Sequence, residues 1–399
     1  MSEILERTIA TQLLSWMQEH QQEKVQCIER LSGIESPSDV PAAQQPVLRL
    51  LAAAFTDLGF RVRKIPGRTS GGHLFARPLR RDKDKPLQLL LGHCDTVWPI
   101  GSIDDMPVRI ENGILYGPGV YDMKTGLVQM LFALRALQEL GLEAPLTPIV
   151  FINSDEKIGS HESSRYIHRL ARLANRSLVL EPSLGPAGRL KTARKGVGRF
   201  TITAKGKAAH AGLDPEAGAS AILELSHVIQ TLFALNDVEK GITINVGMID
   251  GGLRANVVAP VSSAVTDVRV LTHADARTIE QAIHGISPIT PGVSLEIEGR
   301  IGRPPMEKTP ANRQFWNMAQ NLARDLHIDL EQGTAGGGSD GNTTSLYNAT
   351  LDGLGAVGDG AHARHEQVVL NKLPERGALL ALLLLCPAVG QETPAEPGV

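Results

Sequence analysis

This chain of 399 residues has few cysteines, a small net charge and no long apolar run. Its three cysteines, Cys27, Cys94 and Cys386, are odd in number and widely spaced, which argues against a disulfide framework. The 40 Lys and Arg residues are balanced by 43 Asp and Glu residues, so the sequence has no basic footprint for nucleic acid. Its longest apolar run, Ala378 to Leu385, is far shorter than the roughly 18 residues needed to span a membrane.

The first residues also lack the pattern of a secretory signal. Residues 1–19 are amphipathic and include acids, without the basic region and apolar stretch of a signal peptide. Together with the few cysteines, this predicts a cytoplasmic protein with neither a nucleic-acid nor a membrane partner. The chain is long enough to bury more than one core without disulfides.

Short apolar runs alternate with helical patterns in the first half of the chain. Residues 87–92, 148–152 and 177–180 are typical of buried strands, and residues 125–140 have the apolar spacing of a helix. Strands that alternate with helices predict an α/β fold, with a mostly parallel sheet and helices on both of its faces.

A different pattern begins near Arg189. Residues 199–204, 242–249 and 264–270 alternate between apolar and polar side chains, as in an antiparallel sheet with one exposed face. We therefore predict a smaller α+β domain, an antiparallel sheet with two helices, that interrupts the first domain. The expected boundaries are residues 1–187 and 307–388 for the two parts of the first domain, 188–306 for the inserted domain and 389–399 for a disordered tail.

Histidine and acidic residues follow the ends of the predicted strands. His93 and Asp95, after the first strand, are two positions apart and so point to the same side of an extended chain. That spacing suits a metal-bound imidazole whose other nitrogen is held by a carboxylate. Asp155 and Glu156 follow the second strand, and Glu181 follows the third. Because open α/β sheets bind ligands at the carboxyl ends of their strands, we expect these side chains to converge.

Three further segments, two of them glycine-rich, complete the pattern. Residues 117–124 enter the helix and contain Asp122, and an aspartate at the start of a helix is more often a cap than a ligand. Residues 336–341 offer backbone amides that could hold a carboxylate, and residues 360–366 contain His362. If His362 shares a site with His93, the chain must leave the first domain and return to it, which agrees with the predicted insertion.

In this order the motifs resemble those of the co-catalytic zinc metallopeptidases, the family of glutamate carboxypeptidase, aminoacylase, acetylornithine deacetylase and succinyl-diaminopimelate desuccinylase. The bacterial glutamate carboxypeptidase branch is the most similar, and the likeness runs from about Ile28 to Leu385. The motifs that carry it are His93-x-Asp95, Gly-Pro-Gly before Asp122-x-Lys124, Asp155-Glu156, Glu181-Pro182, Gly-Gly-Gly-Ser-Asp340 and His362, with further matches at residues 206–212, 251–256, 267–269 and 302–304.

The resemblance implies a hydrolase with one or two zinc ions in each chain, which cobalt or manganese could replace. His93, Asp122 and Glu181 would hold one zinc. Asp122 would bridge to a second ion that His362 would also hold. Glu156 would be the general base that takes a proton from metal-activated water. The first domain would be catalytic, and the inserted domain a lid through which two copies form a homodimer.

The same resemblance assigns groups around the metal and the substrate. Asp95 would orient His93, and His210 of the inserted domain would reach the developing oxyanion. The groups that would bind a substrate carboxylate are Arg269, Asn256, Arg303 and the backbone of Gly338. The implied substrate is a small N-acyl or peptidyl amino acid whose free carboxylate lies beside the scissile amide, as in the release of a C-terminal acidic residue. An N-acyl-amino-acid deacylase is the alternative within the same chemistry.

One position departs from the family pattern, which has two consecutive glutamates before x-Gly-Ser. Counting back from Gly159-Ser160, the first glutamate falls on Glu156 and the second, normally a ligand of the second zinc, falls on Lys157. A protonated lysine has no lone pair for a metal and would repel a cation. Sliding the register so that Asp155 is the base and Glu156 a ligand would restore two acids, but it requires an inserted residue before Gly159.

Three interpretations of Lys157 follow. In the first, the site holds a single zinc, and Lys157 replaces the charge of the second ion by pairing with Asp122. In the second, Glu162 or Asp155 supplies the missing ligand. In the third, the site is catalytically dead or altered, and the protein is a binding or scaffold member or performs another acyl-transfer reaction. The other site residues named above are all retained, which favours a working hydrolase.

Overall fold

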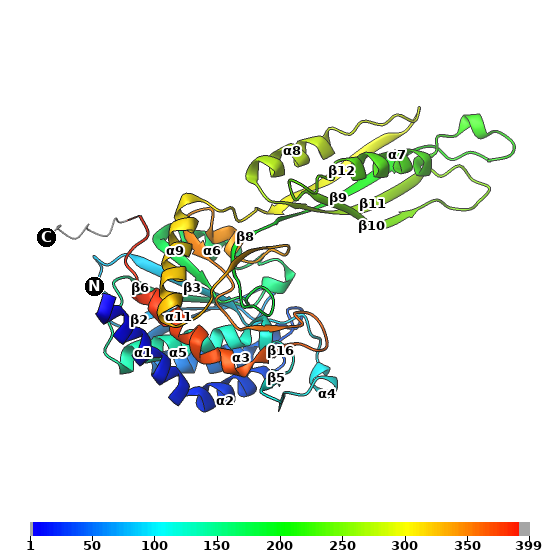
Figure 1. Cartoon of the computed structure of the whole chain (residues 1–399). Coiled ribbons are helices and arrows are strands. Elements are labelled where there is room, and N and C mark those ends of the chain that lie inside the picture. Colours follow the sequence, from blue (N-terminus) through cyan, green and yellow to red (C-terminus); the bar gives the residue numbers. More distant parts are fainter. Residues whose placement is uncertain (1–2, 391–399) are drawn as a thin grey trace. The chain divides into compact units, whose positions relative to one another are not determined.

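The computed structural model describes residues 3–390, with the side chains of residues 7–390. The chain divides into two compact units, which are drawn in Figure 1. Unit 1 comprises Met1–Thr192, Lys308–Thr334 and Ser339–Val399, and unit 2 comprises Ala193–Glu307 and Ala335–Gly338. Residues 391–399, most of the predicted tail, lie outside the described residues.

Unit 1 is built on a six-stranded sheet with the strand order β1-β2-β6-β3-β7-β14. The strands are β1 (Phe60–Ile65), β2 (His73–Pro78), β3 (Leu87–His93), β6 (Thr147–Asn153), β7 (Ala174–Val179) and β14 (Ala349–Leu351). The last four of these run parallel to one another, whereas β1 and β2 form an antiparallel pair at one edge. The mostly parallel sheet expected from the sequence is therefore confirmed.

Helices cover both faces of this sheet. They are α1 (Glu3–Glu19), α2 (Gln21–Ser32), α3 (Pro41–Asp57), α5 (Thr125–Glu139), α6 (Ser164–Leu173), α9 (Pro310–Asp325) and α11 (Leu373–Leu385). Leu90 of β3 belongs to a large core shared with most of these helices, whereas Leu89 and Leu91 pack in a smaller core with Ile167 of α6. Because successive strand residues face opposite sides, this double coverage explains why β3 is buried along its whole length.

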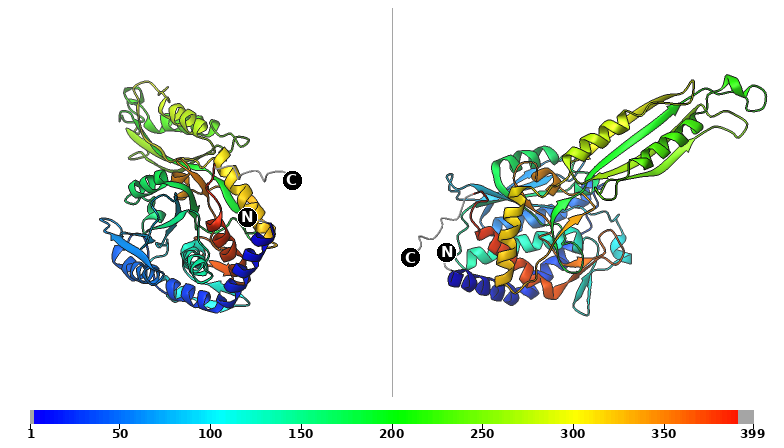
Figure 2. Two further views of the ribbon diagram at one scale, coloured as in Figure 1. Left: turned by 90° about the vertical axis from the view of Figure 1, so that its left-hand side faces the viewer. Right: turned by 45° about the horizontal axis from the view of Figure 1, so that its top comes forward.

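Unit 2 contains a four-stranded antiparallel sheet with the order β10-β11-β9-β12. Its main elements are β9 (Gly196–Lys205), α7 (Ala221–Ala234), β10 (Thr243–Gly251), β11 (Val261–Val270), α8 (His273–His284) and β12 (Ser294–Arg303). Buried residues of both helices pack with strand residues such as Phe200 and Val268 in one core, and the helices lie on one face of the sheet (Figure 2). The predicted antiparallel sheet with two helices is confirmed.

The remaining elements are short. They are α4 (Ser102–Asp105), β4 (Arg109–Glu111), β5 (Ile114–Tyr116), β8 (Leu190–Arg194), β13 (Gln332–Ala335), α10 (Gly341–Thr344), β15 (Gly358–Asp359) and β16 (Gln367–Val369), with single helical turns at Val120–Lys124, Glu156–Ile158, Pro215–Ala217 and Leu370–Lys372. β15, β16, β5 and β4 form a small sheet, and β13 pairs with β8. Within residues 3–390, no helix combines the length and apolar character that crossing a membrane requires.

β7 begins at Ala174, three residues before the apolar run of residues 177–180 that predicted it. The apolar pattern misses this part of the strand because it contains a buried charged residue. Arg176 of β7 is 0% exposed. Its guanidinium donates hydrogen bonds to Gln88 Oε1 and to backbone carbonyls within residues 383–387. A buried guanidinium is tolerated when its donors are satisfied in this way. A pattern of apolar residues alone therefore underestimates the length of this strand.

Lys24 of α2 is a second buried cation of unit 1. Its ammonium lies 3.2 Å from Sδ of Met17 and 3.5 Å from the carbonyl oxygen of Leu373. Burial lowers the pKa of Lys24 from 10.5 to about 7. The unfolded chain keeps this proton up to the ordinary pKa, whereas the folded chain releases it near 7. The free energy of unfolding should therefore rise as the pH increases from about 7 to about 10.5. Below about pH 7 both states carry the proton, so this lysine adds no pH dependence and its full destabilising cost is present.

Replacing Lys24 by Met, which has a similar volume, should remove this dependence. At about pH 7 we expect Lys24→Met to raise the free energy of unfolding by on the order of 2 kcal/mol, because no ammonium is then desolvated. Urea unfolding at about pH 7 and about pH 10 measures the gain, which should shrink at the higher pH. Lys83→Met, at an exposed lysine, is the control. Equal effects of the two substitutions would contradict the conclusion that the buried Lys24 ammonium destabilises the folded state.

Candidate functional site

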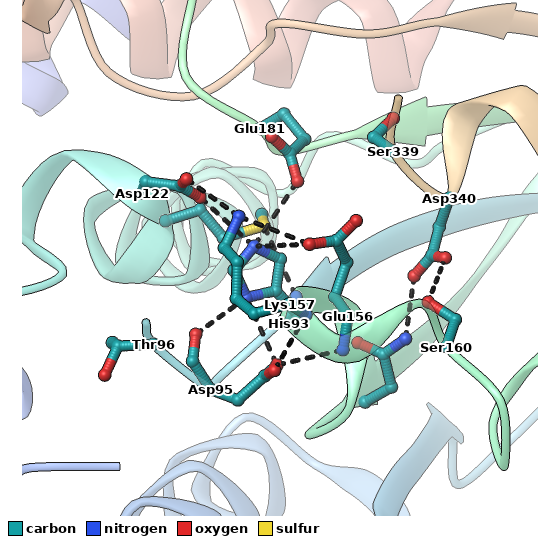
Figure 3. A network of polar contacts seen from close by, with 12 residues as sticks. His93, Asp95, Thr96, Asp122, Glu156, Lys157, Ser160, Glu181, Ser339 and Asp340 are labelled. Atoms are coloured by element: carbon teal, nitrogen blue, oxygen red, sulfur yellow. Dashed lines mark hydrogen bonds and ion pairs between the residues drawn. The ribbon is translucent and has the colours of Figure 1, made fainter. Parts of the chain in front are cut away.

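The candidate site lies at the carboxyl ends of three parallel strands of unit 1. His93 is the last residue of β3, Glu156 begins the turn that follows β6, and Glu181 lies just after β7. Asp122 belongs to the turn Val120–Lys124, directly before α5. All four side chains are buried and cluster together in Figure 3. The structure thus brings together side chains from four separate segments of the chain.

A close approach of α5 to β7 holds two of these segments side by side. Gly126 of α5 lies against the carbonyl oxygen of Leu180, and a Cβ atom at Gly126 would be only 2.0 Å from that oxygen. Any side chain at this position would push α5 away from the end of β7. The glycine therefore keeps Asp122, one turn earlier in the chain, near Glu181.

His93 Nε2 faces three carboxylates. It lies 3.2 Å from Asp122 Oδ1, 3.3 Å from Glu181 Oε1 and 4.0 Å from Glu156 Oε2. Ligand atoms of His93, Glu156 and Glu181 all lie within 4.8 Å of one another. An imidazole nitrogen together with carboxylate oxygens is a donor set that Zn²⁺ accepts. This cluster is therefore a candidate metal centre.

Asp95 holds the other side of the imidazole and links it to the turn that carries Glu156. His93 Nδ1 lies 3.0 Å from the backbone oxygen of Asp95 and 3.4 Å from its Oδ1. The Asp95 carboxylate also accepts hydrogen bonds from the backbone N–H groups of Glu156 and Lys157 and from the Ser38 hydroxyl. Burial would raise the pKa of Asp95, but His93, Ser38 and the N–H of Lys157 hold it below its ordinary value.

Lys157 and His362 meet the second oxygen of Asp122. Lys157 Nζ lies 2.7 Å from Asp122 Oδ2 and 3.2 Å from Glu156 Oε2, and its side chain is only 9% exposed. His362 Nε2 lies 3.1 Å from the same Asp122 oxygen, with a side chain that is 54% exposed. Burial would raise the pKa of Asp122, but Lys157, His362 and His93 hold it well below its ordinary value.

Asp155 and Glu162, the two acids considered as substitute ligands, hold loops in place. Asp155 Oδ2 accepts hydrogen bonds from the backbone N–H groups of Glu162 at 2.7 Å and Ser163 at 3.1 Å. The Glu162 carboxylate accepts hydrogen bonds from the N–H of Arg68 and from the N–H and hydroxyl of Ser70. Both carboxylates therefore have structural partners of their own.

Glu366, which the sequence did not single out, fixes the loop that carries Asp122. It is buried, and its Oε1 accepts hydrogen bonds from the N–H groups of Tyr121 and Asp122. Its Oε2 accepts them from the N–H of Gly119 and the indole of Trp98. Burial raises the pKa of Glu366, an effect that these donors oppose. No rule of spacing connects residue 366 with this loop, so only the folded structure reveals its role.

Asp340 ties the second glycine-rich segment to the end of β6. Its carboxylate accepts hydrogen bonds from Asn153 Nδ2 at 2.7 Å and from the Ser160 hydroxyl at 2.5 Å (Figure 3). Ser160 follows the turn that carries Glu156 and Lys157. The sequence indicated that the backbone amides of residues 336–341 could hold a carboxylate. In the structure, the side chain of Asp340 is the group of this segment that fixes the turn carrying Glu156 and Lys157.

The remaining predicted site residues lie in unit 2 and are His210, Asn256, Arg269, Arg303 and Gly338. His210 is exposed, and its Nδ1 accepts hydrogen bonds from the backbone N–H groups of residues 212 and 213. In the neutral ring this arrangement assigns the proton to Nε2, which is then a hydrogen-bond donor.

The guanidinium of Arg269 already has one partner in unit 2. Its Nε and Nη2 donate to the two carboxylate oxygens of Asp267 at 2.7 and 3.0 Å. Its Nη1 lies 3.4 Å from the carbonyl oxygen of Gly336. Gly338 packs closely on Arg303, because a Cβ atom at Gly338 would be 2.6 Å from Arg303 Cδ. Arg269 and Arg303 therefore each lie against a glycine of residues 336–338.

Three comparisons with known proteins agree with one another. A sequence profile of peptidase family M20/M25/M40 matches residues 89–385. The chain is 27% identical over 371 residues to carboxypeptidase G2 of Pseudomonas sp. (strain RS-16), which covers 90% of this chain and 88% of the relative. It is 26% identical over 348 residues to succinyl-diaminopimelate desuccinylase of Delftia acidovorans, covering 81% and 88%. The crystal structure of aminopeptidase PepT from Bacillus cereus is 22% identical and matches with a TM-score of 0.76 over 91% of this chain and 98% of that chain.

Replacing Glu366 by Gln should loosen the Asp122 loop. An amide accepts hydrogen bonds only through its oxygen, so its NH₂ group would face two N–H donors. We expect the free energy of unfolding to fall by about 2–4 kcal/mol, measured by urea unfolding. Glu111→Gln, at an exposed glutamate, is the control and should change it by less than about 0.5 kcal/mol. A similarly small effect at Glu366 would show that its hydrogen bonds do not hold the loop.

Proposed function

The chain belongs to peptidase family M20/M25/M40, as its motifs predicted, and we propose that it is a metal-dependent amidohydrolase of the carboxypeptidase type. Membership of this family identifies it as a hydrolase of the metallopeptidase class. The observation that carries the finer proposal is the convergence of His93 Nε2, Asp122 Oδ1 and Glu181 Oε1 in one buried space. The proposed reaction is hydrolysis of an amide bond that lies beside a free carboxylate.

The orientation of His93 supports a cation at this position. With Nδ1 turned to the backbone oxygen of Asp95 at 3.0 Å, the ring proton is assigned to Nδ1 and the Nε2 lone pair points at carboxylates. A lone pair aimed at Asp122 and Glu181 is unfavourable unless a cation or a proton lies between them. We propose Zn²⁺, which Co²⁺ or Mn²⁺ could replace. When bound, such an ion lowers the pKa of a water molecule and polarises the amide carbonyl.

Glu156 is the proposed general base. Its Oε2 is 4.0 Å from His93 Nε2, farther than the oxygens of Asp122 and Glu181, although a ligand atom of Glu156 also lies within 4.8 Å of those of His93 and Glu181. This offset suits a carboxylate that takes a proton from the attacking water and passes it to the leaving amine nitrogen. Asp95 contributes by orienting His93 and by holding the turn that carries Glu156.

Unit 2 would supply the groups that recognise the substrate. The Nε2–H of His210 is the proposed donor to the developing oxyanion. Arg269 is the proposed partner of the free carboxylate, and because Asp267 occupies its Nε–Nη2 edge, the substrate would bind on the Nη1 side. The proposed secondary contacts are Asn256, Arg303 and the N–H of Gly338.

The names of the two relatives indicate two versions of the reaction. A carboxypeptidase releases a C-terminal residue, whose carboxylate is free, and a desuccinylase removes a succinyl group. We propose release of an acidic or similar amino acid from an N-acyl or peptidyl substrate, with N-acyl-amino-acid deacylation as the alternative. A panel that varies the acyl group against the amino acid distinguishes the two. A homodimer formed through unit 2 and a cytoplasmic location stay predictions from the sequence.

Hydrolysis of N-acyl glutamate or aspartate by the zinc- or cobalt-loaded protein is the direct test. Glu156→Gln should lower kcat by about 10²–10⁴-fold, because no base then accepts the proton, while the metal content stays unchanged. Glu111→Gln is the matched control at an exposed glutamate. If no substrate of the panel is hydrolysed, or if Glu156→Gln keeps kcat within twofold, the catalytic proposal is wrong and the non-catalytic alternative gains support.

Arg269 should determine the affinity for the substrate carboxylate. Arg269→Lys should raise KM about tenfold or more with little change in kcat, because an ammonium lacks the planar fork that pairs with a carboxylate. Arg300→Lys, at an exposed arginine of unit 2, should leave KM unchanged. A substrate analogue with an amide in place of the free carboxylate should be equally poor for both proteins. A rise of KM for this analogue as well would mean that Arg269 acts in another way.

A further inference from the structure

Lys157 places a positive charge beside the second carboxylate oxygen of Asp122. Its Nζ is 2.7 Å from Asp122 Oδ2, whereas Asp122 Oδ1 faces His93 Nε2 at 3.2 Å. The same ammonium lies 3.2 Å from Glu156 Oε2. Figure 3 shows Lys157 reaching the carboxylates from the turn after β6. Asp122 thus has one oxygen toward the proposed metal and the other toward a lysine.

The contacts around Asp122 Oδ2 leave a second metal ion poorly accommodated. Zinc binds carboxylate oxygen at about 2.0–2.2 Å, close to where the ammonium of Lys157 makes its hydrogen bond. His362 Nε2 lies 3.1 Å from the same oxygen. A divalent ion at this position would be held next to a buried ammonium, and like charges at that separation repel strongly in a buried site.

The ammonium of Lys157 gives the centre the same net charge that a second metal ion and its glutamate ligand would give it. A divalent ion together with a glutamate at position 157 would carry a net charge of +1, and the ammonium of Lys157 carries the same charge. It meets two carboxylates, those of Asp122 and Glu156, that would otherwise be buried with less compensation. The lysine therefore supplies the electrostatic effect of an ion and its ligand together.

We infer that the ammonium of Lys157 takes the place of a second metal ion, so that the centre holds one ion, on His93, Asp122 and Glu181. Asp122 then bridges that ion and the ammonium. Because Lys157 contacts both Asp122 and Glu156, it also fixes the proposed base relative to the proposed ligands. The inference rests on the proposed function, since it presupposes the first ion. The Glu162 carboxylate and Oδ2 of Asp155 already accept hydrogen bonds that hold other loops.

Zinc per folded chain, measured by mass spectrometry after removal of excess metal, tests the inference without reference to activity. We expect one ion in the natural protein, two in Lys157→Glu and one in Lys157→Met. Lys64→Glu, which makes the same charge change at an exposed lysine, should keep one ion. Two ions in the natural protein, or a single ion in Lys157→Glu, would overturn the inference.

His93→Ala in the same experiment separates this inference from the proposed function. It should lose the ion, because the imidazole is a ligand of the first position. If the natural protein holds no zinc, the metal-dependent function fails and the inference fails with it. If it holds two ions and hydrolyses the substrate, only the inference fails.

Thermal unfolding gives a second readout that does not require turnover. Without metal, Lys157→Glu adds a carboxylate beside Asp122 and Glu156, so its midpoint should fall and its rise on adding zinc should exceed that of the natural protein. Lys157→Met avoids this repulsion and keeps the fold testable. With one ion bound, the kcat of Lys157→Met should be lower than that of the natural protein by at least about tenfold, because the buried positive charge is missing. Equal zinc-induced shifts in the natural protein and Lys157→Glu, or full activity of Lys157→Met, would refute the substitution.

Discussion

A cluster of buried negative charge is the constraint on which the rest of this structure depends. The carboxylates are those of Asp95, Asp122, Glu156 and Glu181, all of them at most 7% exposed. Such a cluster is stable only when cations and N–H donors compensate it. Hydrogen-bond donors compensate the charge of Asp95, and the ammonium of Lys157 compensates those of Asp122 and Glu156. The space beside His93 Nε2 is suited to a metal ion. The proposed metal and the unusual lysine are thus two answers to one electrostatic requirement.

The fold meets this requirement by bringing distant segments to one edge of a sheet. Parallel strands end on the same side, so β3, β6 and β7 deliver His93, Glu156 and Glu181 to neighbouring positions. Gly126 allows α5 to approach β7, which places Asp122 beside them. Glu366 then fixes the Asp122 loop through backbone donors. The geometry of the site is therefore a property of the strand order and of a few close contacts.

The sequence predicted those features whose residues form a pattern of their own. The run of β3, apolar except for Gln88, and the alternation of β9 follow from burial on two faces and on one face respectively, and both strands are confirmed. Lys157 stood out because the motif around it fixes its register. Ser38 and Glu366 could not be found, because each acts through a hydrogen bond to a segment far away in the chain. The sequence also contained no sign that Arg176 is buried, because a charged residue does not fit the apolar pattern from which buried strands are predicted.

The hydrogen bonds from Tyr121 and Asp122 to Glu366 join residues that are 245 and 244 positions apart. During synthesis, the ribosome therefore makes the Asp122 loop long before the residue that fixes it. All of unit 2 emerges in the interval, as does α9. Long-range contacts of this kind form late in folding. A chain that has not yet reached Glu366 can expose the histidine and acids of the site, but only a chain that includes Glu366 can hold them in the arrangement proposed to bind a metal ion.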